Sequence, residues 1–351
     1  MSPALVNARR GLRWLWAMLL ATSGCLWWTK RQLSASGAVI VFTLHRVLDE
    51  AGYLRTQSLP GIVIKDRTFR EFVAYVVRRY EPVDFRQVRP GKPSDKVRVA
   101  FTFDDGWSDN YSIALPIARK HEIPLTIFIC PGLLDRDRPF WPEEVAALIR
   151  AIRPAVEVSE IEAEIETLKT YAQEARTQYL ARLSEEARHR GICIGPSDID
   201  RTVSWAAIAE MDREGVNFGS HTQTHQILTK VSPEEARKEV QISKAAIERA
   251  LSKRCDTFAY PNGNWSVETQ QLLAEEGIKL AVTSERGAWT AHCDLLAIPR
   301  SNISEDNVVG PRGRFSPTMF EYTTFWKSWR ETKAKSRLAF RPSQEPTPAA
   351  L

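Results

Sequence analysis

Three apolar runs separated by helical patterns constrain the fold of this chain more than any other feature. The runs cover residues 37–44 (GAVIVFTL), 97–103 (VRVAFTF) and 124–130 (PLTIFIC). Such runs are typical of strands that are buried on both faces. The segments between them, residues 68–80 and 108–121, have helical periodicity, with a cap expected at Thr68 and a break at Pro116. This alternation predicts a parallel sheet with crossover helices.

The same alternation resumes at residue 216 and continues to about residue 300. We expect strands at residues 216–220, 257–260, 278–283 and 295–298, and helices at 233–251 and 266–276. Residues 141–210 depart from the pattern, because they are charge-rich and helical, and we interpret them as an insertion with no obvious chemistry. Residues 37–330 are thus predicted to form one domain, and residues 331–351 a disordered tail.

Two adjacent carboxylates, Asp104 and Asp105, end the second apolar run and are followed by Gly106. Adjacent side chains on an extended backbone point to opposite sides, so one carboxylate can bind a cation while the other handles a proton. An Asp-Gly pair by itself is more typical of a solvated turn. Residues elsewhere in the chain favour the first interpretation.

His221 and His225 follow directly on the strand expected at residues 216–220. Two histidines four residues apart in one helical turn place both imidazoles on one face, and neutral imidazole is a good ligand for Zn²⁺ and similar ions. Helical faces also produce this spacing by chance. Together with one strand-end aspartate, the pair gives three ligands and an open position for water, as metal-assisted hydrolysis requires. The second aspartate is then placed to act as the base.

Residues 102–106 (TFDDG) and 220–225 (SHTQTH) resemble the first two motifs of the polysaccharide deacetylases, the NodB-homology group of carbohydrate esterase family 4. The resemblance covers roughly residues 37–303, without the insertion. It implies a distorted, incomplete (β/α) barrel with its site at the C-terminal ends of the strands. It also implies that Asp104 is the catalytic base and that Asp105, His221 and His225 hold a divalent metal. That metal would be Zn²⁺, with Co²⁺, Ni²⁺ and Mn²⁺ as alternatives.

Residues 258–263 (FAYPNG) resemble the third motif of the same family. The resemblance implies that the backbone N–H of Asn262 contributes to an oxyanion hole, although an aromatic residue is usual at this position. Many members carry an arginine early in this motif that pairs with the catalytic aspartate, and this chain has Phe258 there. Arg300 either replaces that arginine or forms a structural ion pair.

The last motif of the family is an apolar strand that ends in a histidine, which protonates the leaving amine. His292 is the last histidine of this chain, and no convincing strand leads into it. Residues 41–45 (VFTLH) fit the motif at the N-terminal end of the domain instead, as in the branch that contains poly-N-acetylglucosamine deacetylases. We therefore expect His45 to be the general acid, with a core histidine as the alternative.

These residues predict a metal-dependent hydrolase that removes N-acetyl groups from amino sugars of a glycan or a lipid-linked saccharide. One alternative keeps the chemistry and makes the enzyme a deformylase or other deacylase of a lipid-linked sugar. Another is a catalytically inactive glycan-binding module on the same fold. The module predicts loss of catalytic residues, whereas the set described above is complete.

The excess positive charge of the chain lies at its N-terminal end. Five of the 48 basic residues fall in residues 1–36, which contain no acid, so the remaining 43 balance the 43 acidic residues of the chain. This distribution gives no reason to expect a nucleic-acid partner. The five cysteines are scattered and form no CxxC pair, so they predict neither a disulfide framework nor a cysteine zinc site.

Residues 12–28 form an apolar run with tryptophans near both ends and basic residues on both sides. We expect an interfacial or short anchoring helix within residues 1–36, which makes a membrane surface a predicted partner. The alternatives are a cleaved signal peptide and a helix packed on the protein body. The predicted location is the membrane, with the cytoplasmic face favoured over the periplasm or export.

Overall fold

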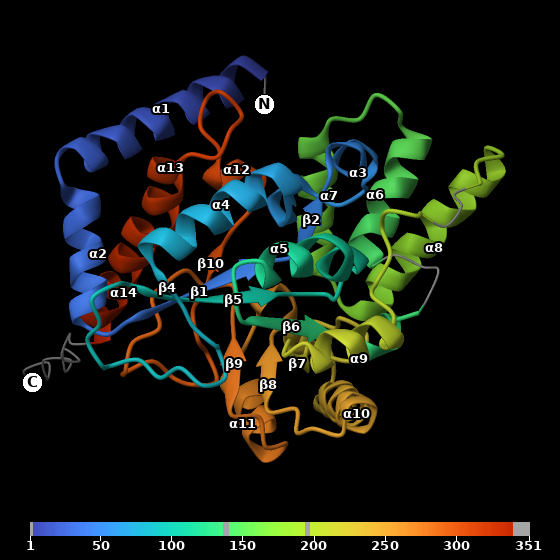
Figure 1. Ribbon diagram of the computed structural model, residues 1–351. Helices are drawn as coiled ribbons and strands as arrows, with labels where there is room; N and C mark the ends of the chain where they lie inside the picture. The colour runs from blue at the N-terminus through green and yellow to red at the C-terminus, as the bar shows by residue number, and fades with distance from the viewer. Residues whose placement is uncertain (1–2, 136–139, 194–196, 340–351) are drawn as a thin grey trace, which may run out of the picture.

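The computed structural model describes residues 3–135, 140–193 and 197–339 of the chain. At its centre is a parallel sheet of eight strands in the order β10-β1-β5-β6-β7-β8-β9, with β4 paired to β5. The strands are β1 (Val39–Leu44), β4 (Glu81–Pro82), β5 (Arg98–Phe103), β6 (Leu125–Ile129), β7 (Asn217–Ser220), β8 (Thr257–Ala259), β9 (Leu280–Val282) and β10 (Ser301–Asn302). The sheet is open between β9 and β10, and Figure 1 shows β8 and β9 running across the direction of β1, β5 and β6. The predicted incomplete (β/α) barrel is confirmed.

The central strands are buried on both faces, as their sequences predict. Every residue of β1 and β6 is buried, and in β5 only Arg98 is partly exposed. β1 and β5 pair in parallel along their whole length, so that Leu44 lies opposite Phe103. The residues that follow these two positions therefore emerge side by side at one edge of the sheet.

Four helices that cover the sheet agree with the expected alternation, with differences at their ends. They are α4 (Asp66–Arg79), α5 (Leu115–Arg119), α10 (Pro233–Leu251) and α11 (Val267–Glu275). A fifth, α9 (Trp205–Arg213), falls mostly within the segment that was expected to be the insertion. The π-helical turn η2 (Asn110–Ala114) precedes α5, so the interruption lies just before Pro116. The predicted cap at Thr68 is wrong: Lys65 is the N-cap of α4, and the Thr68 hydroxyl donates instead to Glu305, 2.9 Å away.

The insertion forms a separate helical layer with its own apolar core. Its helices are α6 (Trp141–Ile152), α7 (Val158–Lys169) and α8 (Gln173–His189). Val145, Ile149 and Ile161 are fully buried among them. The helix α9 does not belong to this layer, because Ile208 and Met211 pack into the main core. The insertion therefore ends earlier than the predicted residue 210.

Short elements that were not predicted surround the C-terminal edge of the sheet. The strands β2 (Arg46–Leu48) and β3 (Val63–Lys65) form a two-stranded sheet. The chain between them forms α3 (Glu50–Arg55) and the 3-10 turn η1 (Pro60–Ile62). Further 3-10 turns are η3 (Pro131–Leu133), η4 (Leu228–Lys230) and η5 (Pro261–Gly263). The strand predicted at residues 295–298 is wrong, because only Ile298 forms a bridge, to Val282.

The N-terminal run forms two helices and not one. They are α1 (Pro3–Thr22) and α2 (Cys25–Ala35), and the chain turns between them at Gly24, whose φ is 77°. Figure 1 shows both helices along one side of the molecule, next to α13 and α14. In the described part of the chain, no helix combines the length and apolar character needed to cross a bilayer.

The C-terminal part of the domain is helical further than predicted. It contains α12 (Glu305–Val308), α13 (Pro317–Glu321), the π-helical turn η6 (Tyr322–Trp326) and α14 (Lys327–Ala339). Residues 331–339 thus belong to α14, and the prediction of a disordered tail is wrong for them. The rest of the predicted tail, residues 340–351, lies outside the described residues.

Candidate active site

The polar residues predicted to act together meet at the C-terminal edge of the sheet. His45 follows β1, Asp104 and Asp105 follow β5, and His221 follows β7. Because parallel strands end at the same edge, residues that are far apart in sequence converge there. Except for His45, which is partly exposed, these side chains are buried.

Asp105, His221 and His225 form a compact group. One ligand atom from each residue lies within 4.8 Å of the others. The Nε2 atoms of His221 and His225 are 3.5 Å and 3.4 Å from Asp105 Oδ1. Ligands held at about 2.0–2.1 Å by a tetrahedral Zn²⁺ are themselves about 3.3–3.4 Å apart, so this spacing fits a shared cation.

Neighbouring hydrogen bonds leave the ligand atoms free. The Trp107 indole N–H donates to Asp105 Oδ2 over 3.0 Å, while Asp105 Oδ1 is buried with no hydrogen-bond partner. His221 Nδ1 lies 2.7 Å from the carbonyl oxygen of Ala259, which can only accept, so Nδ1 carries the proton and Nε2 has its lone pair free. A buried carboxylate oxygen without a partner is costly, and a cation there would satisfy it.

The backbone around these ligands is not the helical turn that was predicted. Thr222 and His225 have φ values of 65° and 60°, and Asp105 has a φ of 74°. The left-handed region costs a residue with a Cβ roughly 1–2 kcal/mol, and such strain is often found at functional sites. The two histidines converge because the loop after β7 folds back, and the helical spacing plays no part.

Burial sets the protonation state of His225. It lowers the pKa of His225 to about 3, although the charge of Asp105 opposes it. The imidazole is therefore neutral near pH 7, as a metal ligand must be. The donor set and its charge state both fit the divalent cation that the sequence predicts.

Asp104 is held by Arg300. The two terminal nitrogens of Arg300 donate to the two Asp104 oxygens over 2.8 Å and 2.7 Å, and Arg300 Nε donates to the Thr283 carbonyl over 2.9 Å. Burial alone would raise the pKa of Asp104, but the charge and hydrogen bonds of Arg300 outweigh it and hold the pKa well below its usual range. Arg300 thus makes the pairing expected of the arginine missing at Phe258.

His45 lies beside Asp104, with its Nε2 atom 3.9 Å from Asp104 Oδ2. Burial lowers the pKa of His45, and the nearby charges of Asp105 and Asp104 partly oppose this. Its side chain keeps 20% of its surface exposed, so a substrate can reach it. A histidine sealed in the core would not be accessible in this way.

Asn262 lies just after β8 and has a left-handed backbone, with a φ of 57°. Its side chain donates to Asn264 over 2.5 Å, and its carbonyl accepts from Ser284 Oγ over 3.1 Å. Among the described residues, none accepts a hydrogen bond from the Asn262 backbone N–H. That donor is available for a ligand.

Comparison with known proteins identifies the family. The model of the polysaccharide deacetylase family matches residues 91–281, which is more than half of the chain. The chain belongs to the polysaccharide deacetylase family. The matched segment contains the three ligand residues, Asp104 and Asn262, whereas His45 and Arg300 lie outside it. The structure brings these two residues to the same site as the rest.

This family member shares only 18–22% sequence identity with the three individual proteins that follow. YxkH of Bacillus subtilis (strain 168), a candidate polysaccharide deacetylase, is 22% identical over 213 residues, which cover 61% of this chain and 53% of YxkH. The chain thus spans about half the length of this curated relative. The solved structure of the Streptococcus pyogenes deacetylase PplD in complex with acetate has 19% identity and a TM-score of 0.52, over 80% of this chain and 99% of that one. IcaB from Ammonifex degensii has 18% identity and a TM-score of 0.52, over 77% and 94%. These structural similarities show the fold.

The sequence of this deacetylase family member did not indicate a role for Arg46, a buried arginine near the site. Its guanidinium group is fully buried, lies 4.2 Å from the centroid of the Trp107 ring, and donates to Asp109 over 3.0 Å. It also contacts Asp200, which follows the insertion. Because Trp107 in turn donates to Asp105, Arg46 helps to position a predicted metal ligand. The only sequence signal was its place next to His45.

The insertion also contributes to the surroundings of the site, contrary to our expectation. Phe140, directly before α6, places its ring 5.4 Å from the His225 ring and 4.9 Å from the Trp107 ring. Glu143 of α6 is buried and accepts a hydrogen bond from Ser58 over 3.0 Å. Burial, and next the charge of Asp105, raise the pKa of Glu143 to about 8. The insertion therefore brings a carboxyl group to the site that is protonated near neutral pH.

Proposed function

We propose that the protein is a metal-dependent hydrolase that removes N-acetyl groups from the amino sugars of a glycan. The observation that carries this proposal is the placement of Asp105, His221 and His225 within 4.8 Å of one another, beside the Asp104–Arg300 pair. Membership of the polysaccharide deacetylase family supports the reaction class. A binding module would not need a carboxylate held ionised next to a set of free metal ligands.

In the proposed reaction, water adds to the acetamide carbonyl carbon, the C–N bond breaks, and acetate and a free amine are formed. Asp105, His221 and His225 would hold Zn²⁺, or Co²⁺, Ni²⁺ or Mn²⁺, which when bound would polarise the carbonyl and make water more acidic. Asp104 takes the proton from the attacking water, because Arg300 keeps its carboxylate ionised. The Asn262 N–H donates to the oxygen on which negative charge develops.

His45 delivers a proton to the leaving nitrogen. Its lowered pKa leaves it neutral in the resting protein near pH 7, so it must gain a proton during the reaction. Asp104 Oδ2 is 3.9 Å from Nε2, beyond hydrogen-bond distance, so the proton that Asp104 takes from water would pass to His45 through an intervening water molecule. The amine then leaves in its neutral form, which is the better leaving group.

Acetate release from metal-loaded protein tests this function. The substrates are a panel of N-acetylated oligosaccharides and lipid-linked sugars, with N-formyl analogues to separate a deformylase from a deacetylase. We expect Asp104→Asn to keep its metal and lose turnover by about 10²–10⁴-fold. His221→Ala should lose metal and turnover together. Normal metal binding with no product from any substrate would contradict the proposed hydrolase and favour the glycan-binding module.

A further inference from the structure

The helix α1 has apolar side chains on two opposite faces. Ala17 and Leu20 are buried against the protein body. On the other face, Leu12, Leu15, Trp16 and Leu19 follow the spacing of one helical stripe and are between 48% and 69% exposed. A surface helix of a globular protein needs only one apolar face, so the second face requires another explanation.

The exposed apolar residues are concentrated at this end of the chain. Among the described residues, twelve large apolar side chains are exposed, and six of them lie in α1 and α2. We call these six the apolar stripe: Leu12, Leu15, Trp16, Leu19, Trp27 and Trp28. Scattered apolar residues on a surface need no explanation, but such a concentration on two successive helices indicates an interaction site.

One exposed cation, Arg31 of α2, lies next to the stripe. Its guanidinium carbon is 5.5 Å from the centroid of the Trp27 ring, and it forms no ion pair within the described part of the chain. The neighbouring Lys30 is paired with Glu321. Arg13 lies on the other face of α1, four and seven residues before the buried Ala17 and Leu20, and its Nε atom is buried.

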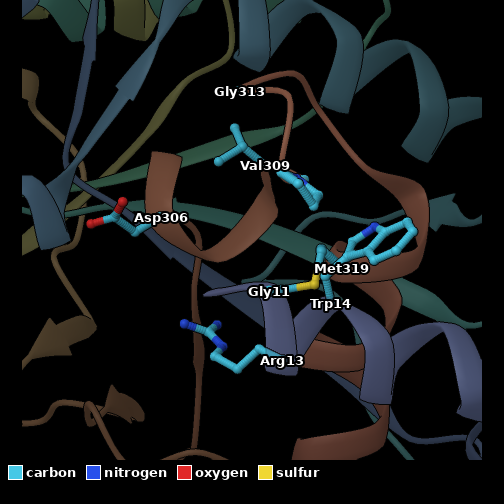
Figure 2. Close-up of a pocket in the computed structure, with 9 residues that line it drawn as sticks. Gly11, Arg13, Trp14, Asp306, Val309, Gly313 and Met319 are labelled. Atoms are coloured by element: carbon cyan, nitrogen blue, oxygen red, sulfur yellow. The ribbon is translucent and has the colours of Figure 1, made fainter. Parts of the chain in front are cut away.

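The surroundings of Arg13 are open to the outside. Arg13 and Trp14 line a pocket of about 410 Å³ between α1 and the segment from Asp306 to Met319. Figure 2 shows Arg13 on the opposite side of this pocket from Gly313. The helix α1 is therefore not sealed against the α12–α13 connection.

We propose that α1 and α2 dock the protein on an anionic lipid bilayer, lying in the plane of the membrane. The apolar stripe enters the boundary between headgroups and acyl chains, and Arg31, beside Trp27, binds headgroup phosphates. Residues 1–36, which carry the stripe, contain five cations and no acid, and Lys30 is paired with Glu321, so this segment keeps an excess of positive charge that complements an anionic surface. The same charge would oppose docking of a second copy through this face, because two like-charged segments would meet.

Vesicle co-sedimentation of the full chain tests this inference. We expect binding to phosphatidylcholine vesicles that contain phosphatidylglycerol, and weaker binding at high salt. The double variant Trp16→Glu, Leu19→Glu changes two exposed side chains and should weaken binding at least about tenfold. Ile242→Glu is the matched control, because Ile242 is 51% exposed on α10 and lies outside the stripe.

Arg31→Gln tests the charge beside the stripe separately. It should weaken binding to the anionic vesicles by roughly fivefold, the effect of one cation near a membrane surface, and should not change binding to phosphatidylcholine alone. Equal binding of Arg31→Gln and the parent protein to anionic vesicles would overturn the assignment of headgroup phosphates to Arg31.

Three further results would overturn the docking inference as a whole. They are a parent protein that stays in the supernatant, an Ile242→Glu variant that loses binding as much as the stripe variant, and a dimer that the stripe variant converts to monomer. Circular dichroism would show that the variants are folded. Hydrolysis of a small soluble substrate should be unchanged in the stripe variant, so this test can fail without affecting the proposed function.

Discussion

Two buried arginines, Arg46 and Arg300, flank the predicted metal ligands and differ in what they hold. Both are almost completely buried, and both donate to aspartates at the C-terminal edge of the sheet. Arg300 binds Asp104, the proposed base, directly with two hydrogen bonds. Arg46 bonds to none of the predicted ligands, and its contact with the ring of Trp107 links it to Asp105. The same chemical group thus controls the charge of one residue and the position of another.

The charge balance around the two arginines also differs. Arg300 pairs with a single carboxylate, and the pKa of Asp104 falls well below its usual range. Arg46 pairs with Asp109 and Asp200 at once, and Glu143 lies near the same group. Because several acids share the single cation Arg46, Glu143 near this group can stay uncharged. Asp104 has Arg300 to itself and stays ionised. Mutations on the two sides should therefore affect different measurements.

The largest effect is expected on stability from Arg46→Met. The change leaves Asp109 and Asp200 buried without their cation, and breaking a buried ion pair in this way typically costs about 3–5 kcal/mol. The free energy of unfolding in urea measures it. Arg67→Met, at an exposed pair with Glu71, is the control and should cost less than about 1 kcal/mol. If Arg46→Met is as mild as this control, the Arg46 cluster does not stabilise the fold.

A large effect on turnover is expected from Arg300→Met. Without the arginine, burial raises the pKa of Asp104 against only the smaller opposing effects of His221 and His45, so the carboxylate becomes protonated at a higher pH. We expect kcat to fall about 10²-fold near pH 7 and the acidic limb of the pH profile of kcat/KM to move to higher pH. Metal content should stay unchanged, because Arg300 bonds to none of the three ligands. Loss of metal in this variant would mean that Arg300 acts on the ligand set as well.

The sequence could predict the strand ends but not the contacts between distant segments. Apolar runs that stop at His45, Asp104 and His221 show which residues reach the same edge, because parallel strands end together. The pairing of Arg300 with Asp104 spans 196 residues and was left open between two roles. The contact of Arg46 with Asp200 spans 154 residues and had no local signal. Such partners are decided by packing, which the spacing of residues does not encode.

The local backbone conformation around the site was the second feature that the sequence did not predict. The spacing of His221 and His225 suggested a helical turn, but left-handed residues in the loop bring them together. Likewise Thr68 had the sequence context of a helix cap, but its hydroxyl donates a hydrogen bond to the buried Glu305 instead. In both cases a tertiary contact outweighed the local preference. The structure brings the three predicted ligands together, although their backbone is not the predicted one.

A smaller effect is expected on metal affinity from Trp107→Phe. The phenyl ring can keep the contacts with Arg46 and Phe140, but the hydrogen bond to Asp105 Oδ2 is lost. Removing a group that orients a metal ligand typically weakens metal binding about 10–100-fold. Competition with a chelator measures this affinity. Trp265→Phe removes the same kind of bond, to Glu285, and should leave the affinity unchanged. Equal affinities for all three proteins would show that Arg46 and Trp107 do not act on Asp105.

The effect expected from Glu143→Gln is on the pH dependence of stability. The folded protein holds a proton on Glu143 up to about pH 8, whereas the unfolded chain releases it near pH 4.5. Between these values the folded state binds the extra proton, so this contribution to stability is complete at low pH and is lost as the pH rises toward 8. The loss is at most about 1.4 kcal/mol for each pH unit.

Urea unfolding of chelator-treated protein from pH 5 to pH 8 should show a shallower decline in Glu143→Gln than in the parent protein. Glu160→Gln, at an exposed position of α7, is the matched control. If the parent protein and Glu143→Gln decline alike, Glu143 is ionised in the folded state, and the Arg46 side balances its acids as fully as the Arg300 side does.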